Sequence, residues 1–405
     1  MYISRQKYLN KLISQKDKDL IKVITGIRRC GKSILLFNIY YDYLISQGID
    51  KGHIIKINLE SINNIELRND KALYDYIVSR IADDERYYIF IDEIQFVNNF
   101  EDIVNGLRAD FNCDIYITGS NSKLLSKDIN TKMRGRSIEI KVFPLSFGEF
   151  YEYYGGDKTK CFNNYLMYGG LPYLISETNE NNKNDYLKMI CDTVVSKDII
   201  DRHNIRQTNL FQAFVNFLCS NIGSYVSANK IANTLKSNGY SKVTHETIEN
   251  YLDFVCDAFL FYKAERYDIK GKQYLKTLNK YYICDLGIRN SELNYRQIEI
   301  THSLENLIYL ELLRRGYIVD IGKNNAKEID FVVKDNKNLF YIQVAYTLNS
   351  FDKIEQEISS FYGLDDGYKK IVITMDEDPF VNLKNGYKKI NIFDFLLNDK
   401  SLEEI

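Results

Sequence analysis

One segment constrains the fold of this chain more than any other: Gly26-Ile27-Arg28-Arg29-Cys30-Gly31-Lys32-Ser33. It fits the pattern G-x-x-x-x-G-K-[ST] and lies between two apolar runs, Leu20–Thr25 and Ile34–Ile39. A strand that turns into a helix through such a loop is typical of a parallel sheet covered by helices. The glycines let backbone N–H groups surround phosphate oxygens, and the helix N-terminus adds partial positive charge. The segment therefore predicts a phosphate-binding loop; the alternative is a chance match in a glycine turn.

The residue types in this loop suit a nucleoside triphosphate with a divalent cation. Lys32 is expected to reach the β- and γ-phosphates, and the Ser33 hydroxyl is expected to ligate Mg²⁺. The predicted nucleotide site comprises the consecutive residues Gly26, Ile27, Arg28, Arg29, Cys30, Gly31, Lys32, Ser33 and Ile34. Cys30 is either an oxidation-sensitive thiol or an ordinary small residue, since a reactive thiol requires a lowered pKa.

Two acidic residues end another apolar run. Tyr87–Ile91 has the pattern of a buried strand, and Asp92 and Glu93 follow it directly. An Asp at the carboxyl end of a core strand can hold Mg²⁺, and a neighbouring Glu can polarise a water for attack on the γ-phosphate. We therefore expect Asp92 to be a metal ligand and Glu93 to be catalytic. The alternative is a strand end with two solvated acids.

A third apolar run, Asp114–Thr118, leads into a small polar cluster. Ser120 and Asn121 in this cluster are candidates to contact the γ-phosphate or the attacking water. Taken alone, this pattern indicates only a strand followed by a turn. It supports a nucleotide site because it follows the first two motifs in the order of the sequence.

Two arginines follow in the string Arg134-Gly135-Arg136. An arginine here can stabilise the charge that develops on the γ-phosphate, either within one chain or across the subunit interface of an oligomer. The alternative is a pair of surface arginines. The sequence does not distinguish Arg134 from Arg136.

The composition limits the classes of function. The chain has 405 residues, enough for two or three domains, and its net charge of −2 is no signature of nucleic-acid binding. Its seven cysteines form no C-x-x-C pair and its amino terminus lacks a signal-peptide pattern, so we expect reduced thiols and a cytoplasmic protein. It has no apolar run of about 18 residues, so no membrane-spanning helix is expected.

Residues 1–150 alternate strand-like and helical patterns. The strand-like runs are Leu20–Thr25, His53–Leu59, Tyr87–Ile91 and Asp114–Thr118. This alternation predicts an α/β fold with a parallel sheet, in which ligand sites gather at the carboxyl ends of the strands. All three polar motifs fall at such ends. Residues 151–204 are mainly helical in pattern, and the Gly-Gly-Leu-Pro turn at 169–172 is expected to start a helical lid over the nucleotide.

Residues 205–290 have the pattern of three helices followed by a two-stranded hairpin, which is typical of a winged helix. The expected strands, Phe259–Arg266 and Gln273–Cys284, flank a turn at 270–272. The segment has eleven Lys and Arg and seven Asp and Glu, a net of +4, which favours contacts with the phosphates of DNA. The third helix begins with Glu246 and Glu249, which disfavours base reading, and winged helices also bind proteins.

Residues 295–405 follow the order helix, three strands, helix, strand, which matches the restriction-endonuclease-like fold. Nucleases of that fold hold Mg²⁺ with an Asp and a following (Asp/Glu)-x-Lys. Glu305 and Asp330 stand at acidic positions, but Gln343-Val344-Ala345 replaces the Glu-x-Lys. Because Gln binds a hard cation poorly and Ala carries no ammonium, we expect a catalytically inactive domain in which Glu305 and Asp330 have structural uses such as ion pairs.

Several strings together resemble one family: GIRRCGKS, YYIFIDEIQ, YITGSNSKLL, RGR, FPLSFGEF and YGGLP. They are similar to those of bacterial and archaeal AAA-type ATPases, more narrowly the group related to signal-transduction ATPases that carries a C-terminal domain of unknown function. The resemblance spans nearly the whole chain. It implies a five-stranded ATPase core, a helical lid, a winged helix and a C-terminal nuclease-like fold. It also implies ATP rather than GTP as the nucleotide.

These observations favour an ATPase that uses ATP and Mg²⁺ and whose nucleotide state rearranges C-terminal domains that bind nucleic acid or protein. The alternative is a slow nucleotide-gated switch or scaffold that binds a protein partner or DNA. A third hypothesis is an ATP-dependent nuclease, which the altered Gln343-Val344-Ala345 string disfavours.

Replacement of Lys32 tests the phosphate-binding loop directly. Lys32→Ala removes the ammonium expected at the β- and γ-phosphates, so ATP turnover should be abolished. Phosphate release from Mg-ATP by the purified variant, beside the wild type, gives the result. Undiminished turnover in the variant would contradict the role assigned to the loop.

Overall fold

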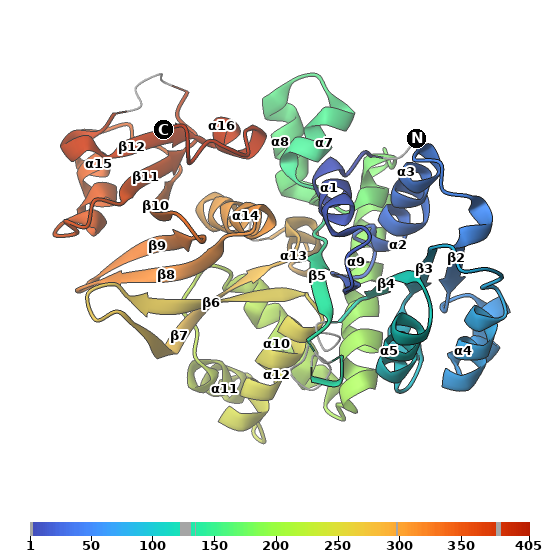
Figure 1. Ribbon diagram of the computed structural model, residues 1–405. Helices are drawn as coiled ribbons and strands as arrows, with labels where there is room; N and C mark the ends of the chain where they lie inside the picture. The colour runs from blue at the N-terminus through green and yellow to red at the C-terminus, as the bar shows by residue number, and fades with distance from the viewer. Residues whose placement is uncertain (1–2, 122–130, 134, 297–298, 378–381) are drawn as a thin grey trace. The chain divides into compact units, whose positions relative to one another are not determined.

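The chain forms two compact units in a computed structural model that describes residues 3–121, 131–133, 135–296, 299–377 and 382–405 (Figure 1). The first unit comprises Met1–Pro144 with Asp257–Phe259, and the second comprises Leu145–Cys256 with Leu260–Ile405. The domain limits predicted at residues 150, 204 and 290 all lie within the second unit. Among the described residues, no helix has the length and apolar character needed to cross a membrane.

The first unit is built on a sheet of five strands that all pair in parallel with their neighbours (Figure 1). The strands are β1 (Ile21–Thr25), β2 (Ile54–Asn58), β3 (Tyr87–Asp92), β4 (Cys113–Gly119) and β5 (Ser137–Lys141). Their spatial order is β2–β3–β4–β1–β5, so the predicted parallel α/β fold is confirmed. Because all strands run the same way, Thr25, Asp92 and Gly119 end at one edge of the sheet.

Helices pack on the two faces of this sheet against different kinds of side chain. They are α1 (Gln6–Gln15), the continuous segment α2 (Lys32–Ile34), η1 (Leu35–Tyr40) and α3 (Tyr41–Ser46), and then α4 (Asp70–Val78) and α5 (Phe100–Asp110). Alternate aliphatic residues of β1 to β4 form one core with α4 and α5. In a second cluster, the rings of Phe90 and Tyr116 lie 5.8 and 5.0 Å from that of Tyr40. This packing anchors the helical segment whose first turn carries Lys32 and Ser33.

The helical part of the second unit follows the predicted order. Its helices are α7 (Phe147–Tyr154), α8 (Lys158–Tyr168), η6 (Pro172–Ile175), α9 (Glu180–Thr193), η7 (Val194–Asp201), α10 (Thr208–Ser220), α11 (Ala228–Ser237), α12 (His245–Asp257) and α13 (Leu286–Glu292). The Ser227 hydroxyl accepts from Lys230 N at 3.2 Å, and the Thr244 hydroxyl accepts from Thr247 N at 3.1 Å. These hydroxyls cap the starts of α11 and α12.

One sheet of seven strands joins the hairpin to the C-terminal strands (Figure 1). Its strands are β6 (Phe261–Asp268), β7 (Gln273–Ile283), β8 (Ile318–Asn324), β9 (Lys327–Lys334), β10 (Leu339–Ala345), β11 (Lys369–Thr374) and β12 (Lys388–Asn391), in the order β12–β11–β10–β9–β8–β6–β7. Strands β6 and β8 pair in parallel. The predicted limit at residues 290–295 thus separates strands of one sheet. The winged-helix and restriction-endonuclease-like assignments stay predictions.

Three further helices complete this unit: α14 (Ile300–Arg315), α15 (Phe351–Ile358) and α16 (Ile392–Leu397). The first two occupy the positions predicted for helices. Strand β12 and helix α16 were not expected from the sequence. The Gly-Gly-Leu-Pro string does form a turn, because α8 ends at Tyr168 and η6 begins at Pro172, whereas its role as a lid over the nucleotide stays a prediction.

A tight junction joins this turn to the start of α13. The buried carboxylate of Asp285 accepts hydrogen bonds from Gly170 N at 2.7 Å, Gly287 N at 2.9 Å and Ile288 N at 3.3 Å. Burial raises the pKa of Asp285 to about 6, so at neutral pH it is ionised and suits these N–H donors. A Cβ at Gly169 would lie 1.9 Å from Asp285 Oδ1, so this position has no room for a side chain.

Gly155 and Gly169 have similar backbone conformations but different surroundings. Substitution of each by alanine therefore distinguishes the cost of steric conflict from the cost of backbone strain. Gly155 and Gly169 both end helices, with φ of 61° and 75° and ψ of −164°, but a Cβ at Gly155 would meet nothing within 4 Å. Gly155→Ala should cost about 1–3 kcal/mol of strain. Gly169→Ala should cost at least about 2 kcal/mol more, because it also displaces Asp285.

Urea unfolding compares the stability of the two variants, and hydrogen exchange at the Gly170, Gly287 and Ile288 amides locates the damage. We expect faster exchange of these amides in Gly169→Ala only. Equal destabilisation of the two variants, with unchanged exchange, would contradict the role of the Asp285 junction.

Candidate active site at the phosphate-binding loop

The loop Gly26–Ser33 follows β1 and leads into α2, as its pattern predicts. It contains three positive φ angles, 146° at Gly26, 66° at Arg29 and 101° at Gly31. A Cβ at Gly26 would lie 2.1 Å from Val142 O, so space as well as conformation requires glycine there. The loop is a compact turn before a helix N-terminus, where N–H groups can bind phosphate oxygens.

The two residues predicted as metal ligands lie side by side. Ser33 Oγ donates to the Asp92 carboxylate, 2.8 Å from Oδ2 and 3.0 Å from Oδ1. A hydroxyl and a carboxylate oxygen, completed by phosphate oxygens and water, are the ligands that Mg²⁺ prefers. Together with the glycine turn, this donor set fits a magnesium nucleotide.

Burial and hydrogen bonding act in opposite directions on Asp92. Its side chain is enclosed, and burial raises the pKa of Asp92, as does the neighbouring charge of Glu93. Hydroxyl donors lower it: Thr118 Oγ1 donates to Asp92 Oδ1 at 2.5 Å, and Ser33 donates from the other side. The two hydroxyls therefore help to keep this buried carboxylate in the ionised form that binds a cation.

Lys32 is buried, and its ammonium is held by groups of its own loop. Nζ donates to the carbonyl oxygens of Gly26 at 2.9 Å and Ile27 at 3.2 Å, and it lies 3.9 Å from Glu93 Oε1. This arrangement places the ammonium predicted to reach the β- and γ-phosphates beside the predicted catalytic carboxylate.

Glu93 is held in an unusual backbone conformation. Its φ of 55° and ψ of 52° lie in the left-handed region, which costs a non-glycine residue about 1–3 kcal/mol. Its carboxylate accepts hydrogen bonds from the Gln95 side-chain amide and from Ser120 Oγ, the latter at 3.4 Å, and its backbone N donates to Thr118 Oγ1 at 3.0 Å. The three strand-end motifs thus meet around Glu93 and Asp92.

The other predicted residues of the loop differ in exposure. Ile27 and Cys30 are buried, Arg29 and Ile34 are exposed, and Arg28 Nη1 donates to Glu60 at 3.2 Å. Burial raises the pKa of the Cys30 thiol, which lies 3.4 Å from Val142 O. A raised pKa is the opposite of what thiol reactivity requires, so Cys30 behaves as an ordinary small residue.

The remaining candidates from the sequence are Asn121, Arg134 and Arg136. Asn121 is buried next to Ser120 at the end of β4. Arg134 lies outside the described residues. Arg136 is exposed and directly precedes β5. The first residue of β5 is in register with Ile21, the first residue of β1. Arg136 therefore lies at the edge of the sheet opposite the phosphate-binding loop, about 16 Å from it along the five-residue strand β1. The structure does not bring Arg136 to Lys32 within one chain, and its action across a subunit interface stays a prediction.

Two residues of the site were missed from the sequence. Thr118 bonds both Asp92 and the Glu93 backbone, and Gln95 bonds Glu93. Thr118 stands one residue before Gly119 in a string already considered, and its inward direction follows from the alternation of side chains along β4. Gln95 carries no comparable signal, because its side chain reaches back through a short 3₁₀ turn, η4 (Ile94–Phe96).

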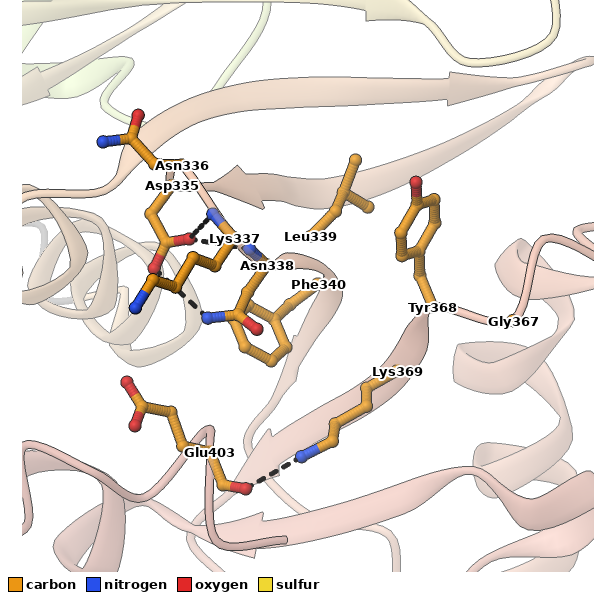
Figure 2. Close-up of a pocket in the computed structure, with 10 residues that line it drawn as sticks. All are labelled: Asp335, Asn336, Lys337, Asn338, Leu339, Phe340, Gly367, Tyr368, Lys369 and Glu403. Carbon is orange, nitrogen blue, oxygen red and sulfur yellow. Dashed lines mark hydrogen bonds between the residues drawn. The ribbon is translucent and has the colours of Figure 1, made fainter.

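The second unit contains a hollow of about 640 Å³ between the β9–β10 turn and the start of β11, and Figure 2 shows the residues that line it. Asp335 accepts from the backbone N of Lys337 and Asn338, both at 2.7 Å, and Lys369 Nζ donates to Glu403 O at 3.0 Å. Several of its polar groups therefore bond one another, and it lacks the glycine-and-lysine arrangement of the phosphate loop.

Of the two acidic residues considered for a nuclease site, Glu305 forms an ion pair and Asp330 accepts a backbone hydrogen bond. Lys280 Nζ lies 2.8 Å from Glu305 and 2.5 Å from Glu328, and the Tyr282 hydroxyl donates to Glu305 at 2.6 Å. Asp330 accepts from Val344 N at 2.8 Å. Within the described ranges, no group of three or more His, Cys, Asp or Glu side chains is arranged to hold a metal ion.

Comparison with known proteins agrees with the site. Residues 18–151 match the family model of an AAA domain, and residues 159–299 match a domain of unknown function, DUF8612. An uncharacterized protein of Haemophilus influenzae is 41% identical over 401 residues, covering 98% of each chain. The uncharacterized protein MJ1544 of Methanocaldococcus jannaschii is 33% identical over 407 residues, covering 95% of this chain and 86% of that one. A solved structure of the Aeropyrum pernix ORC1 protein in complex with DNA is 12% identical, covers 72% of this chain and 91% of that one, and has a TM-score of 0.30.

The parallel sheet, the phosphate-binding loop and the match over residues 18–151 define an AAA-type P-loop domain. Within that class, the chain belongs to the family that includes the Haemophilus influenzae and Methanocaldococcus jannaschii proteins, to which it is similar over almost its full length.

Removal of the Thr118 hydroxyl tests the electrostatics of Asp92. Thr118→Val keeps the shape of the side chain but deletes a donor that lowers the pKa of Asp92, so that pKa rises further. Because protons compete with Mg²⁺ for the carboxylate, the acid limb of Mg²⁺-dependent turnover should move to higher pH, and apparent Mg²⁺ affinity should fall about tenfold or more.

Magnesium titrations of ATP turnover at several pH values measure both effects. Thr118→Ser retains the hydroxyl and should behave like the wild type. An unchanged pH profile in Thr118→Val would show that Asp92 does not hold the cation.

Proposed function

We propose that this chain binds Mg-ATP in the loop Gly26–Ser33 and hydrolyses it, and that the nucleotide state controls the residues from 145 onward, which bind nucleic acid or a protein partner. The observation that carries the proposal is the contact of Ser33 with Asp92, at 2.8 and 3.0 Å. This contact joins the phosphate loop to the end of β3, which is distant in the sequence. When bound, Mg²⁺ would be held by Ser33 and Asp92 and would offset negative charge on the phosphate groups.

The side chains divide the work of hydrolysis. The backbone N–H groups of the loop bind phosphate oxygens, and Lys32 contributes a buried positive charge. Glu93 accepts a proton from the attacking water as general base. Ser120 directly follows β4, the strand next to β3, and its hydroxyl donates to Glu93. Exclusion of water from these buried groups strengthens their electrostatic interactions.

A second candidate function, a slow nucleotide-gated switch, is favoured by the bonds that Glu93 makes. Its carboxylate already accepts from Gln95 and Ser120 and lies near Lys32. A base whose oxygens are occupied by donors is less ready to accept a proton from water. Basal turnover should then be slow until a partner releases Glu93 from Gln95.

The class of partner rests on the charge of residues 205–290, where eleven basic and seven acidic residues leave a net of +4. This excess favours a nucleic-acid backbone. On α12, however, Glu246 and Glu249 are exposed, and Glu249 lies 3.3 Å from His245. These acids disfavour entry of α12 into a DNA groove and leave a protein partner as the alternative.

Replacement of Glu93 separates binding of ATP from its hydrolysis. Glu93→Gln should retain ATP binding while turnover falls at least about hundredfold, because the amide cannot accept the proton of the water. Glu66→Gln makes the same chemical change at an exposed residue of the first unit and serves as the control. Equilibrium binding of labelled ATP and phosphate release are measured on both variants. Normal turnover in Glu93→Gln would contradict the assignment of the base.

A panel of single-stranded DNA, double-stranded DNA and RNA then distinguishes the two functions. Strong stimulation of wild-type turnover supports a nucleic-acid-linked ATPase, and a slow, unresponsive rate supports the switch. Absence of nucleotide binding by the wild type would overturn the proposal as a whole. DNA left intact with ATP and Mg²⁺ or Mn²⁺ would count against the nuclease hypothesis.

A further inference from the structure

Arg5 lies outside the residues that match the AAA-domain model, yet its side chain reaches the phosphate-binding loop. It precedes α1 and has a left-handed backbone, with φ of 46° and ψ of 37°. Only 5% of the residue is exposed. A buried guanidinium on a strained backbone is costly, so it must be stabilised by the groups around it.

Those groups are two backbone carbonyls and an aromatic ring. Arg5 Nη1 donates to Cys30 O at 3.2 Å, Nη2 donates to Phe143 O at 2.7 Å, and the guanidinium lies 4.6 Å from the ring centre of Tyr8. The Tyr8 hydroxyl accepts from Phe143 N at 3.1 Å. Arg5 thus connects the phosphate-binding loop to the segment that follows β5.

The same segment also contacts the loop directly. Val142 O accepts from the Cys30 thiol at 3.4 Å and is the atom that a Cβ at Gly26 would strike. Val142 N in turn donates to Thr25 O at 2.7 Å. The loop is therefore packed against Val142 and Phe143, and Arg5 bonds both the loop and this segment.

The bond to Cys30 O sets the direction of the next N–H group. In a trans peptide, the carbonyl oxygen and the following N–H point in opposite directions, and the described part of the chain has no cis peptide bond. Since Cys30 O is directed at Arg5, the Gly31 N–H is directed away from it. Gly31 immediately precedes α2, so its N–H is among those at a helix start that no helical carbonyl satisfies.

From these contacts we infer that Arg5 is a positioning residue of the nucleotide site: it fixes the Cys30–Gly31 peptide so that the Gly31 N–H is presented to a phosphate group. The inference rests on the proposed function of the loop as a nucleotide site. The ligand class is a nucleoside diphosphate or triphosphate, and the contribution of Arg5 is to binding rather than to the hydrolytic step.

Binding of a fluorescent ADP analogue to the full chain tests this role. Arg5→Ala frees the Cys30–Gly31 peptide, so the dissociation constant for ADP should rise about tenfold to hundredfold. In ATP turnover, KM should rise while kcat at saturating ATP stays close to that of the wild type. A merely structural role would instead lower kcat through loss of folded protein and leave KM unchanged.

The chain offers a matched control in Arg68. Its guanidinium also donates to two backbone carbonyls, Leu59 O at 2.9 Å and Glu60 O at 3.3 Å, and lies 4.4 Å from the Phe96 ring. Arg68→Ala should leave ADP affinity near the wild-type value. Equal losses in both variants would overturn the specific role of Arg5.

Two further measurements keep the test decisive if Arg5→Ala is unstable. Arg5→Lys keeps the charge but cannot bond two carbonyls with one planar group, so ADP affinity should still fall at an unchanged Tm. Added guanidinium at millimolar concentration should partly restore ADP binding to Arg5→Ala. Wild-type ADP affinity in a folded Arg5→Lys or Arg5→Ala variant would overturn the inference, whereas failure of the wild type to bind ADP would refute the proposed function instead.

Discussion

The parallel pairing of β1, β3 and β4 is the constraint on which the nucleotide site depends. Because these strands run in the same direction, the residues that follow or end them meet at one edge: the phosphate loop after Thr25, the carboxylate of Asp92, and the hydroxyl of Thr118. The residues of the site are separated by long stretches of sequence, so only this pairing brings them within hydrogen-bond distance. The aliphatic core with α4 and α5 holds the strands in place.

Burial of the charged groups at this edge has an energetic cost. Lys32, Asp92 and Glu93 are all nearly inaccessible to water, where an uncompensated charge would be strongly unfavourable. Each is compensated locally: Lys32 by two loop carbonyls, Asp92 by two hydroxyls, and Glu93 by an amide and a hydroxyl. The left-handed conformations at Arg29 and Glu93 add strain at the same place. Such strain is typical of sites where geometry serves binding.

In the second unit, sequence patterns predicted individual helices and strands but not how distant strands pair. Three helices and a hairpin in residues 205–290 were predicted, since apolar spacing and turn residues are local signals. The parallel pairing of β6 with β8 was not predicted, because the sequence near each strand does not indicate which distant strand it pairs with. The hairpin and the C-terminal strands were therefore predicted as separate domains, and the structure places their strands in one sheet. Likewise, the Gly-Gly-Leu-Pro turn was evident, but its fit against Asp285 was visible only in the folded chain.

By itself, the sequence determined the phosphate-binding loop, the strand ends with Asp92 and Glu93, and the parallel α/β class of the first unit. These follow from residue types at fixed local spacing, which short-range sterics and side-chain alternation translate directly into structure. Tertiary structure decided the rest: Thr118 beside Asp92, Gln95 on Glu93, Arg5 on Cys30, and Arg136 at the far edge of the sheet. Such contacts depend on strand order and on the direction of individual side chains. The spacing of residue types along the sequence reveals neither.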